Sequence, residues 1–116
     1  MPLLRITTSA NPTDSNRTKL LQELSGLVAQ RLGKPEAYMM TSLEPGIAMT
    51  FAGSTSPACF VELKSIGRFT PELTAKLSAE LCDRLERGLD VPKDRIYIDF
   101  ADAQGYLWGH GGETFG

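Results

Sequence analysis

The sequence is short of the residues that build metal centres and disulfide frameworks. Its 116 residues include only two cysteines, Cys59 and Cys82, and one histidine, His110. No two cysteines stand at two-residue spacing, so a zinc site has almost no ligands to draw on. Each cysteine sits in an apolar pattern, and we interpret both as buried free thiols rather than as a disulfide. We therefore expect no metal and no other cofactor.

The sequence also lacks an excess of positive charge and any long apolar run. Twelve Lys and Arg stand against fourteen Asp and Glu, which gives a net charge of -2. No global positive field exists to attract phosphate backbones or anionic lipid. The chain shows neither a basic segment followed by an apolar run nor about eighteen consecutive apolar residues, as a signal peptide or a membrane span requires. We expect no nucleic-acid or membrane partner and a cytoplasmic location, with leaderless secretion left open.

The hydrophobic content of 41% is enough for one core, and we expect a single domain over residues 1–116. Alternating patterns predict strands at residues 3–8, 37–43, 58–66 and 95–100, and residues 47–51 form a candidate short strand. Leucines at three- and four-residue steps predict two helices. The first is capped by Asp14 or Ser15 and stopped by Gly33, and the second begins at Thr70 and Pro71 and is closed by Gly88.

The order of predicted elements repeats in the two halves of the chain. Each half reads strand, leucine-striped helix, proline-containing turn and strand, and the prolines Pro35 and Pro92 lie about half the chain apart. This order predicts an α+β fold in which two βαβ repeats form a mixed four-stranded sheet with both helices on one face. The other face is predicted to be polar, and three subunits could close it around water; it carries Arg5, Thr7, Glu62, Lys64, Tyr97 and Asp99.

The last twelve residues combine glycines with aromatic side chains. Five of the eleven glycines fall between Gly105 and Gly116, a composition often typical of disorder. Aromatic residues are interleaved with them, among them Trp108 and Phe115. A solvated tail has little use for such residues, so we predict that the tail docks on a neighbouring surface.

The dipeptide Met1-Pro2 gives the chain a candidate catalytic group. Initiator methionine is generally removed before so small a residue, which would leave Pro2 with a free secondary amine. An α-amino group has a pKa of about 7.7 to 8.0, and burial or a nearby cation lowers it, so a neutral base at physiological pH is readily available. Because Pro2 leads at once into a predicted strand, the amine would be held on a rigid element.

Several short segments, in order and spacing, resemble the macrophage migration inhibitory factor family of the tautomerase superfamily. They are Met1-Pro2-Leu3-Leu4, Gly33-Lys34-Pro35, Phe51-Ala52-Gly53-Ser54-Thr55, Ser65-Ile66-Gly67, Asp94-Arg95-Ile96-Tyr97-Ile98 and Thr114-Phe115. The resemblance implies a homotrimer whose sheets surround a central channel. It also implies a keto-enol tautomerase that acts on phenylpyruvate-like or dopachrome-like compounds in pockets between subunits.

The resemblance also implies a role for each matched residue. Pro2 is the catalytic base, and Lys34 holds the substrate carboxylate or the enolate oxygen and keeps Pro2 neutral. The N–H of Ile66, after Ser65, donates to the same anion. Tyr97, from an adjoining subunit, and Phe115 flank the aromatic ring of the substrate.

The sequence departs from the family at three places. Asp99 stands where the vertebrate cytokine usually has asparagine, and its carboxylate predicts weak activity because it would repel an anionic substrate. An ungapped alignment puts His110 at the pocket tryptophan and Trp108 two residues earlier, so the pocket is reshaped. The Cys-x-x-Cys pair falls on Ala58 and Val61, so we expect no dithiol oxidoreductase activity.

Two other functions stay open from the residues alone. The chain could be a signalling protein that binds a receptor and keeps the pocket as a relic. It could also be a small βαβ-repeat module that binds a regulatory ligand or subunit and does not need Pro2. Retention of Met1 would favour this last interpretation.

Overall fold

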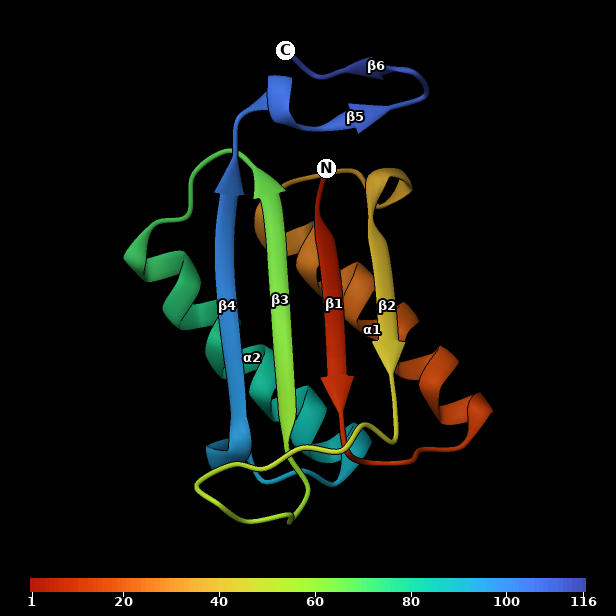
Figure 1. Cartoon of the computed structure of the whole chain (residues 1–116). Coiled ribbons are helices and arrows are strands. Elements are labelled where there is room, and N and C mark those ends of the chain that lie inside the picture. The colour runs from red at the N-terminus through yellow and green to blue at the C-terminus, as the bar shows by residue number, and fades with distance from the viewer.

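A computed structural model describes residues 1–116 and shows one four-stranded sheet with two helices on one of its faces (Figure 1). The strands are β1 (Leu3–Thr8), β2 (Met40–Glu44), β3 (Cys59–Ile66) and β4 (Ile96–Ala103), in the spatial order β2-β1-β3-β4. The helices are α1 (Asp14–Leu32) and α2 (Pro71–Leu89). Neither helix is long and apolar enough to cross a membrane.

Strand directions confirm the predicted pair of βαβ units. β1 pairs with β2 in parallel and β3 pairs with β4 in parallel, while the two central strands β1 and β3 are antiparallel. The fold is therefore α+β with a mixed sheet, as the sequence predicts. One consequence matters for the site: the starts of β1 and β2 and the ends of β3 and β4 meet at one end of the sheet, together with both chain termini (Figure 1).

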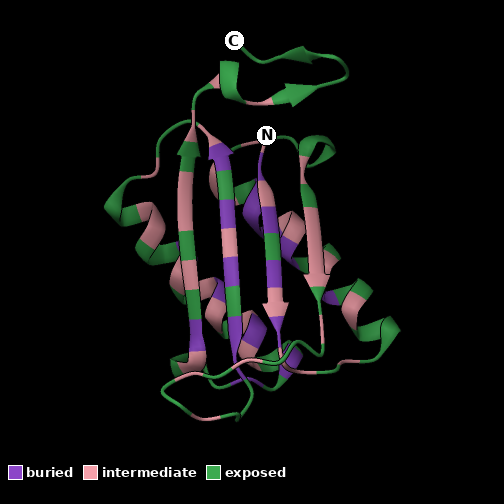
Figure 2. Cartoon of the chain, viewed as in Figure 1, coloured by how far each residue is buried: buried purple, intermediate pink, exposed green.

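The core fills the space between the sheet and the helices. Leu4 and Ile6 of β1 and Val61 and Leu63 of β3 are fully buried against the leucine faces of α1 and α2 (Figure 2). The opposite face of the sheet is covered by nothing in the chain, and the residues predicted to be polar there are half-buried or exposed. Two predicted features, the apolar inner face and the polar outer face, are thus confirmed.

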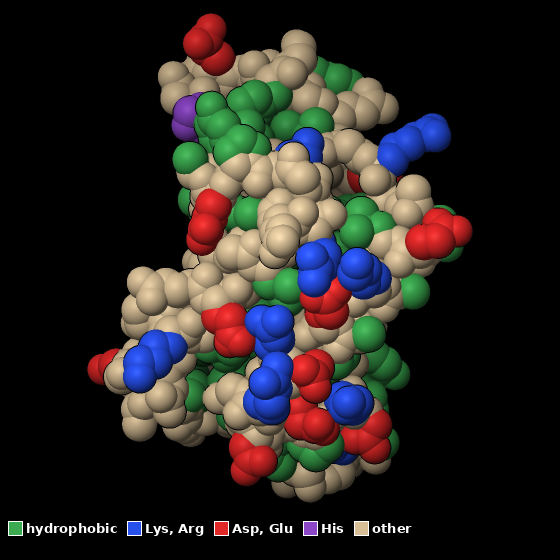
Figure 3. All heavy atoms as spheres, turned by 180° about the vertical axis from the view of Figure 1, so that it is seen from behind, with side chains coloured by type: hydrophobic (Ala, Val, Ile, Leu, Met, Phe, Trp, Pro, Cys, Tyr) green, Lys and Arg blue, Asp and Glu red, His purple; other side chains and the backbone are tan.

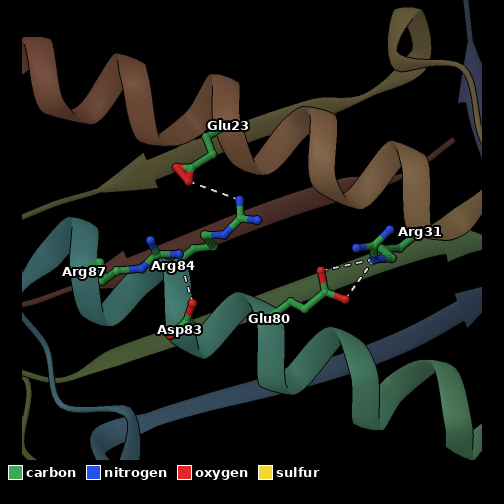
Figure 4. A network of polar contacts seen from close by, with 6 residues as sticks. All are labelled: Glu23, Arg31, Glu80, Asp83, Arg84 and Arg87. Atoms are coloured by element: carbon green, nitrogen blue, oxygen red, sulfur yellow. Dashed lines mark hydrogen bonds and ion pairs between the residues drawn. The ribbon is translucent and has the colours of Figure 1, made fainter.

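The outer side of the helices carries mixed charge rather than an apolar patch (Figure 3). Two ion pairs join α1 to α2: Arg31 donates from Nε to both carboxylate oxygens of Glu80 at 2.8 and 3.1 Å, and Arg84 contacts Glu23 at 3.1 Å (Figure 4). The hydrogen bonds to Glu80 raise the pKa of Arg31 and lower the pKa of Glu80. This pairing fixes the last turn of α1 just before Lys34.

The ends of both helices differ in detail from the prediction. The N-cap of α1 is Thr13, whose hydroxyl accepts from the N–H of Asn16, rather than Asp14 or Ser15. Helix α2 continues through Gly88 to Leu89 and is capped by Asp90, which adopts the left-handed conformation with φ 56°. The cap of α1 at Gly33 (φ 64°) and that of α2 at Thr70 agree with the prediction.

Two strand predictions are also corrected. Residues 47–51 form no strand; only Phe51 makes an isolated bridge, to Ser54 in a tight turn. The expected strand at 37–43 begins later, at Met40, because Glu36–Tyr38 form a short 3-10 helix. Strand β4 runs past residue 100 to Ala103, because its last residues pair with Ser65 and Ile66 at the end of β3.

Candidate active site

A cavity of about 400 Å³ opens at the end of the sheet where β1 begins. Three segments that are distant in sequence line it: the start of the chain, the turn and first residue of β2, and the C-terminal tail. They contribute Met1, Pro2, Leu3, Ala37, Tyr38, Met39, Met40, Trp108, Gly109, His110 and Phe115. The cavity therefore brings together Pro2 and the three aromatic or imidazole side chains predicted from the tail.

Pro2 is held firmly within this cavity. Its ring is fully buried, and its carbonyl oxygen accepts a hydrogen bond of 3.1 Å from the N–H of Met40. Strand β1 starts at the next residue, so the backbone around Pro2 is part of the sheet. The pyrrolidine nitrogen consequently occupies a fixed position at the edge of the core.

The electrostatics at this end of the chain favour a neutral amine. Burial lowers the pKa of the Met1 amino group, and the positive charge of Lys34 lowers it further. Lys34 follows the Gly33 cap of α1, so the end of that helix places its ammonium near the start of β1. An amine in this position gives up its proton more easily than one in water.

The C-terminal tail is ordered and forms one wall of the cavity. A 3-10 turn at Gly105–Leu107 leads into the hairpin of β5 (Gly109–His110) and β6 (Glu113–Thr114). The N–H of Phe115 donates to the carbonyls of Gly105 and Trp108 at 3.1 and 3.2 Å, which closes the tail on itself. A side chain at Gly105 would meet the carbonyl oxygen of Phe115 at 2.5 Å, so this closure requires glycine.

Three rings, those of Tyr38, His110 and Phe115, contact one another in series along this wall. The ring of His110 lies 5.7 Å from that of Phe115 in a stacked arrangement and 6.4 Å from that of Tyr38 at an interplanar angle of 86°. The predicted docking of the tail therefore takes place, in this chain, on the segments around Pro2 and Tyr38. Sequence reasoning missed Tyr38 and Met40 as lining residues, although an aromatic residue four positions after Lys34 was a usable signal.

Lys34, Ser65 and Ile66 lie together in a second, smaller cavity of about 180 Å³ between the end of β3 and the start of α2. Ser65 is buried, and its hydroxyl donates to the carbonyl of Ile66 at 3.3 Å. Lys34 is near enough to the Met1 amino group for its positive charge to lower the pKa of that amine. The two sets of predicted residues therefore lie at the same end of the sheet.

Tyr97 and Asp99 are not brought to Pro2 within one chain. Tyr97 lies at the start of β4, at the opposite end of the sheet, with 64% of its surface exposed and its ring 4.7 Å from that of Phe51. Arg95 holds the surrounding loop by donating to four carbonyls, at Phe51, Ser54, Ser56 and Pro57. Asp99 is exposed on the open face of the sheet, level with Glu62.

The cysteines are unsuited to redox chemistry. Burial raises the pKa of the Cys59 thiol to about 12, and it also raises that of Cys82. Both thiols are free, as expected, but only Cys59 is buried, and Cys82 is half-buried. Since the thiolate is the reactive form, these residues are interpreted as part of the packing.

Comparison with known proteins identifies the family. Residues 1–116 match the family model described as macrophage migration inhibitory factor (MIF). The chain belongs to this family. The MIF homologue of Trichuris trichiura is 36% identical over 115 residues, which are 99% of this chain and 100% of that protein. MIF of Xenopus tropicalis is 35% identical over 88% of this chain and 89% of that protein.

Solved structures of MIF proteins agree with the fold. The MIF homologue from Prochlorococcus marinus superposes with a TM-score of 0.93 at 48% identity, over 98% of this chain and 99% of that one. The Trichinella spiralis MIF gives a TM-score of 0.88 at 34% identity, over 97% and 99% of the two chains. The α+β tautomerase-type fold predicted from the sequence is therefore confirmed.

Proposed function

We propose that this MIF-family protein is a keto-enol tautomerase that acts on phenylpyruvate-like or dopachrome-like compounds. Its base is the secondary amine of Pro2 after removal of Met1. The amine takes a proton from the carbon beside the substrate carbonyl, and the protonated amine then returns a proton, directly or through solvent, to the oxygen of the resulting enolate to give the enol. The same group runs the reaction in reverse, so no cofactor is consumed.

The observation that carries this proposal is the position of Pro2. It is fixed at the start of a core strand, it lines a cavity of about 400 Å³, and the cation of Lys34 acts on the amine beside it. General-base catalysis needs a base with a pKa near the working pH and within reach of the substrate carbon. Burial and the charge of Lys34 support a suitable pKa. The place of Pro2 in the wall of the cavity supports reach to the substrate carbon.

The neighbouring residues have matching roles in this proposal. Lys34 and the N–H of Ile66 stabilise the developing oxyanion or bind the substrate carboxylate. The rings of Trp108, His110 and Phe115 provide a surface on which an aromatic substrate stacks. Ser65 supports the backbone at Ile66 through its hydroxyl.

The active unit in this proposal is a homotrimer. Tyr97 lies at the far end of the sheet from Pro2, so only a second copy of the chain can bring its phenol to this cavity. The uncovered sheet face and the exposed ring of Tyr97 support such an assembly. Three sheets arranged in a ring would place their polar faces around a central channel.

The decisive experiment compares phenylpyruvate enolisation by the wild type and Pro2→Gly across pH. Glycine keeps a terminal amine but makes it primary and frees it from the ring, so kcat/KM should fall, by up to about 100-fold. The wild-type profile should show a group whose pKa lies below the ordinary range of an α-amino group, and this pKa should shift in the variant. Pro92→Gly, at an exposed turn far from the cavity, is the matched control and should keep its activity.

Two results would overturn the proposal. One is a Pro2→Gly variant with unchanged activity, and the other is a native protein whose mass shows that Met1 is retained. Mass spectrometry of the purified protein therefore accompanies the kinetics.

A second function, binding of a receptor protein in signalling, is favoured by the names of the relatives, which describe factors that inhibit macrophage migration. Chemical blocking of the Pro2 amine separates the two functions. If blocking abolishes enolisation and leaves receptor binding intact, the cavity serves catalysis alone.

A further inference from the structure

The small cavity beside Lys34 has an unbalanced charge. It is lined by Leu32, Lys34, Ser65, Ile66, Gly67, Arg68, Phe69 and Leu73. Its only charged side chains are two cations, Lys34 and Arg68, and no carboxylate lines it. Arg68 was not among the residues singled out from the sequence.

Neither cation is neutralised elsewhere in the chain. Arg5, Arg17, Arg31, Arg84 and Arg87 all form ion pairs with acidic side chains, whereas Lys34 and Arg68 form none. The backbone N–H groups of Arg68 and Phe69 also donate no hydrogen bond to another backbone carbonyl. The cavity therefore combines two unpaired positive charges with free donors, which is the chemistry of an anion site.

The position of this cavity relates it to the proposed reaction. Lys34 is near enough to the amino group beside Pro2 to lower its pKa, and it also lines the small cavity together with Arg68. For a substrate that binds beside the proposed base, Arg68 is therefore the next cation beyond Lys34. Arg68 itself is exposed and has no competing partner.

Enolisation of an α-keto acid involves two negative groups. The carboxylate is charged throughout, whereas the carbonyl oxygen gains charge only in the transition state. A planar guanidinium suits a carboxylate because it binds both oxygens at once, and a compact ammonium suits a single oxygen. The small cavity is lined by one cation of each kind, the guanidinium of Arg68 and the ammonium of Lys34.

We infer that Arg68 binds the substrate carboxylate and so leaves Lys34 to stabilise the enolate oxygen. This inference rests on the proposed tautomerase function. It makes Arg68 the residue that selects α-keto acids over neutral ketones of the same shape. Lys34 then acts on the rate of the chemical step, and Arg68 acts on substrate binding.

The test compares phenylpyruvate with its methyl ester, which has no carboxylate, as substrates of Arg68→Gln and Lys34→Gln. Arg68→Gln should raise KM for the acid about tenfold, change kcat less than about twofold, and leave the ester unaffected. Lys34→Gln should lower kcat for both substrates. Arg68→Lys keeps the positive charge but loses the planar guanidinium. Its KM for the acid should lie between those of the wild type and Arg68→Gln.

Lys19→Gln is the matched control, because it removes one positive charge from an exposed, unpaired position near the other end of α1. It should leave KM for the acid unchanged. The inference would be overturned if Arg68→Gln raised KM equally for the acid and the ester, or if it did not raise KM for the acid.

A binding measurement keeps this inference separate from the tautomerase proposal. 3-Phenylpropanoate has the ring and carboxylate of the substrate but cannot enolise. Calorimetry should show that Arg68→Gln weakens binding of 3-phenylpropanoate about tenfold and leaves binding of the corresponding amide unchanged. If the wild type proves inactive, the tautomerase proposal fails, and equal affinities of wild type and Arg68→Gln for this anion would independently reject the carboxylate site.

Discussion

At the scale of single residues, the carboxylate of Asp99 is expected to oppose the proposed reaction. It is exposed on the open sheet face and has no ion-pair partner, so its charge is not compensated within the chain. In an assembly that brings this face to the cavity, Asp99 would repel an anionic substrate and favour protonated Pro2. Asp99→Asn should remove about 1 kcal/mol of repulsion and raise kcat/KM for phenylpyruvate about fivefold.

Steady-state kinetics at low and high salt measure this effect, because screening should shrink the gain. Asp94→Asn, an exposed and unpaired carboxylate outside the sheet, is the control and should have no effect. A rate for Asp99→Asn equal to or below that of the wild type would contradict the prediction.

A residue of the site can be predicted from the sequence when its chemical role depends on its own place in the chain. Pro2 was predicted because its type, its place after Met1 and the following strand all point to one use. Arg68 and Tyr38 were not, because their importance comes from which segments the fold brings together. Tyr97 was assigned only through the resemblance, because its own pattern indicates an ordinary outward strand residue. Within one chain it lies far from Pro2, so nothing in its own strand pattern points to the cavity.

At the scale of elements, the ion pair between Arg31 and Glu80 links the last turn of α1 to the middle of α2. The hydrogen bonds from Arg31 hold the pKa of Glu80 below its ordinary value of 4.5. Ionised Glu80 therefore stabilises the fold fully above pH 4.5, and this contribution is lost as the pH falls through the lowered folded pKa. Glu80→Gln should lower the Tm at pH 7, and the difference from wild type should narrow as the pH falls below 4.5.

Thermal unfolding between pH 3 and pH 7 provides the measurement, with about half a pH unit between samples. Asp83→Asn is the control, since Asp83 pairs with Arg87 inside α2 and does not join the helices. A Tm difference for Glu80→Gln that is the same at every pH would show that lost packing, and not charge, is responsible.

Elements were predicted well where one periodic pattern covers a whole element. The alternation at 58–66 and the leucine stripe of α2 give nearly the observed bounds, because one buried face dictates each pattern. Residues 47–51 carry apolar side chains but find no strand partner in the chain, so a strand-like composition produced no strand. The tail was predicted to dock but not to form a hairpin, because its closure depends on contacts between Gly105 and Phe115.

At the scale of the whole molecule, the proposed trimer makes each active site a shared property of two chains. Pro2→Gly and Tyr97→Ala should each lower the activity when present in every subunit. When the two variants are unfolded and refolded together, some sites receive an intact Pro2 from one chain and an intact Tyr97 from the other. Random mixing should restore about a quarter of the wild-type sites.

Enolisation assays on the mixed and separately refolded samples measure this recovery, with size-exclusion chromatography to establish the assembly. Mixing Pro2→Gly with itself is the control. Recovery no greater than the sum of the separate samples would show that Tyr97 does not serve a partner's site.

Both ends of the polypeptide meet at the end of the sheet that carries the cavity (Figure 1). An affinity tag fused before Met1 would keep the nitrogen of Pro2 in a peptide bond, so that the proposed base would remain an amide that cannot accept a proton. A tag fused after Gly116 would extend from the aromatic wall and crowd the entrance. Functional preparations therefore call for a removable leader whose cleavage leaves Pro2 as the first residue.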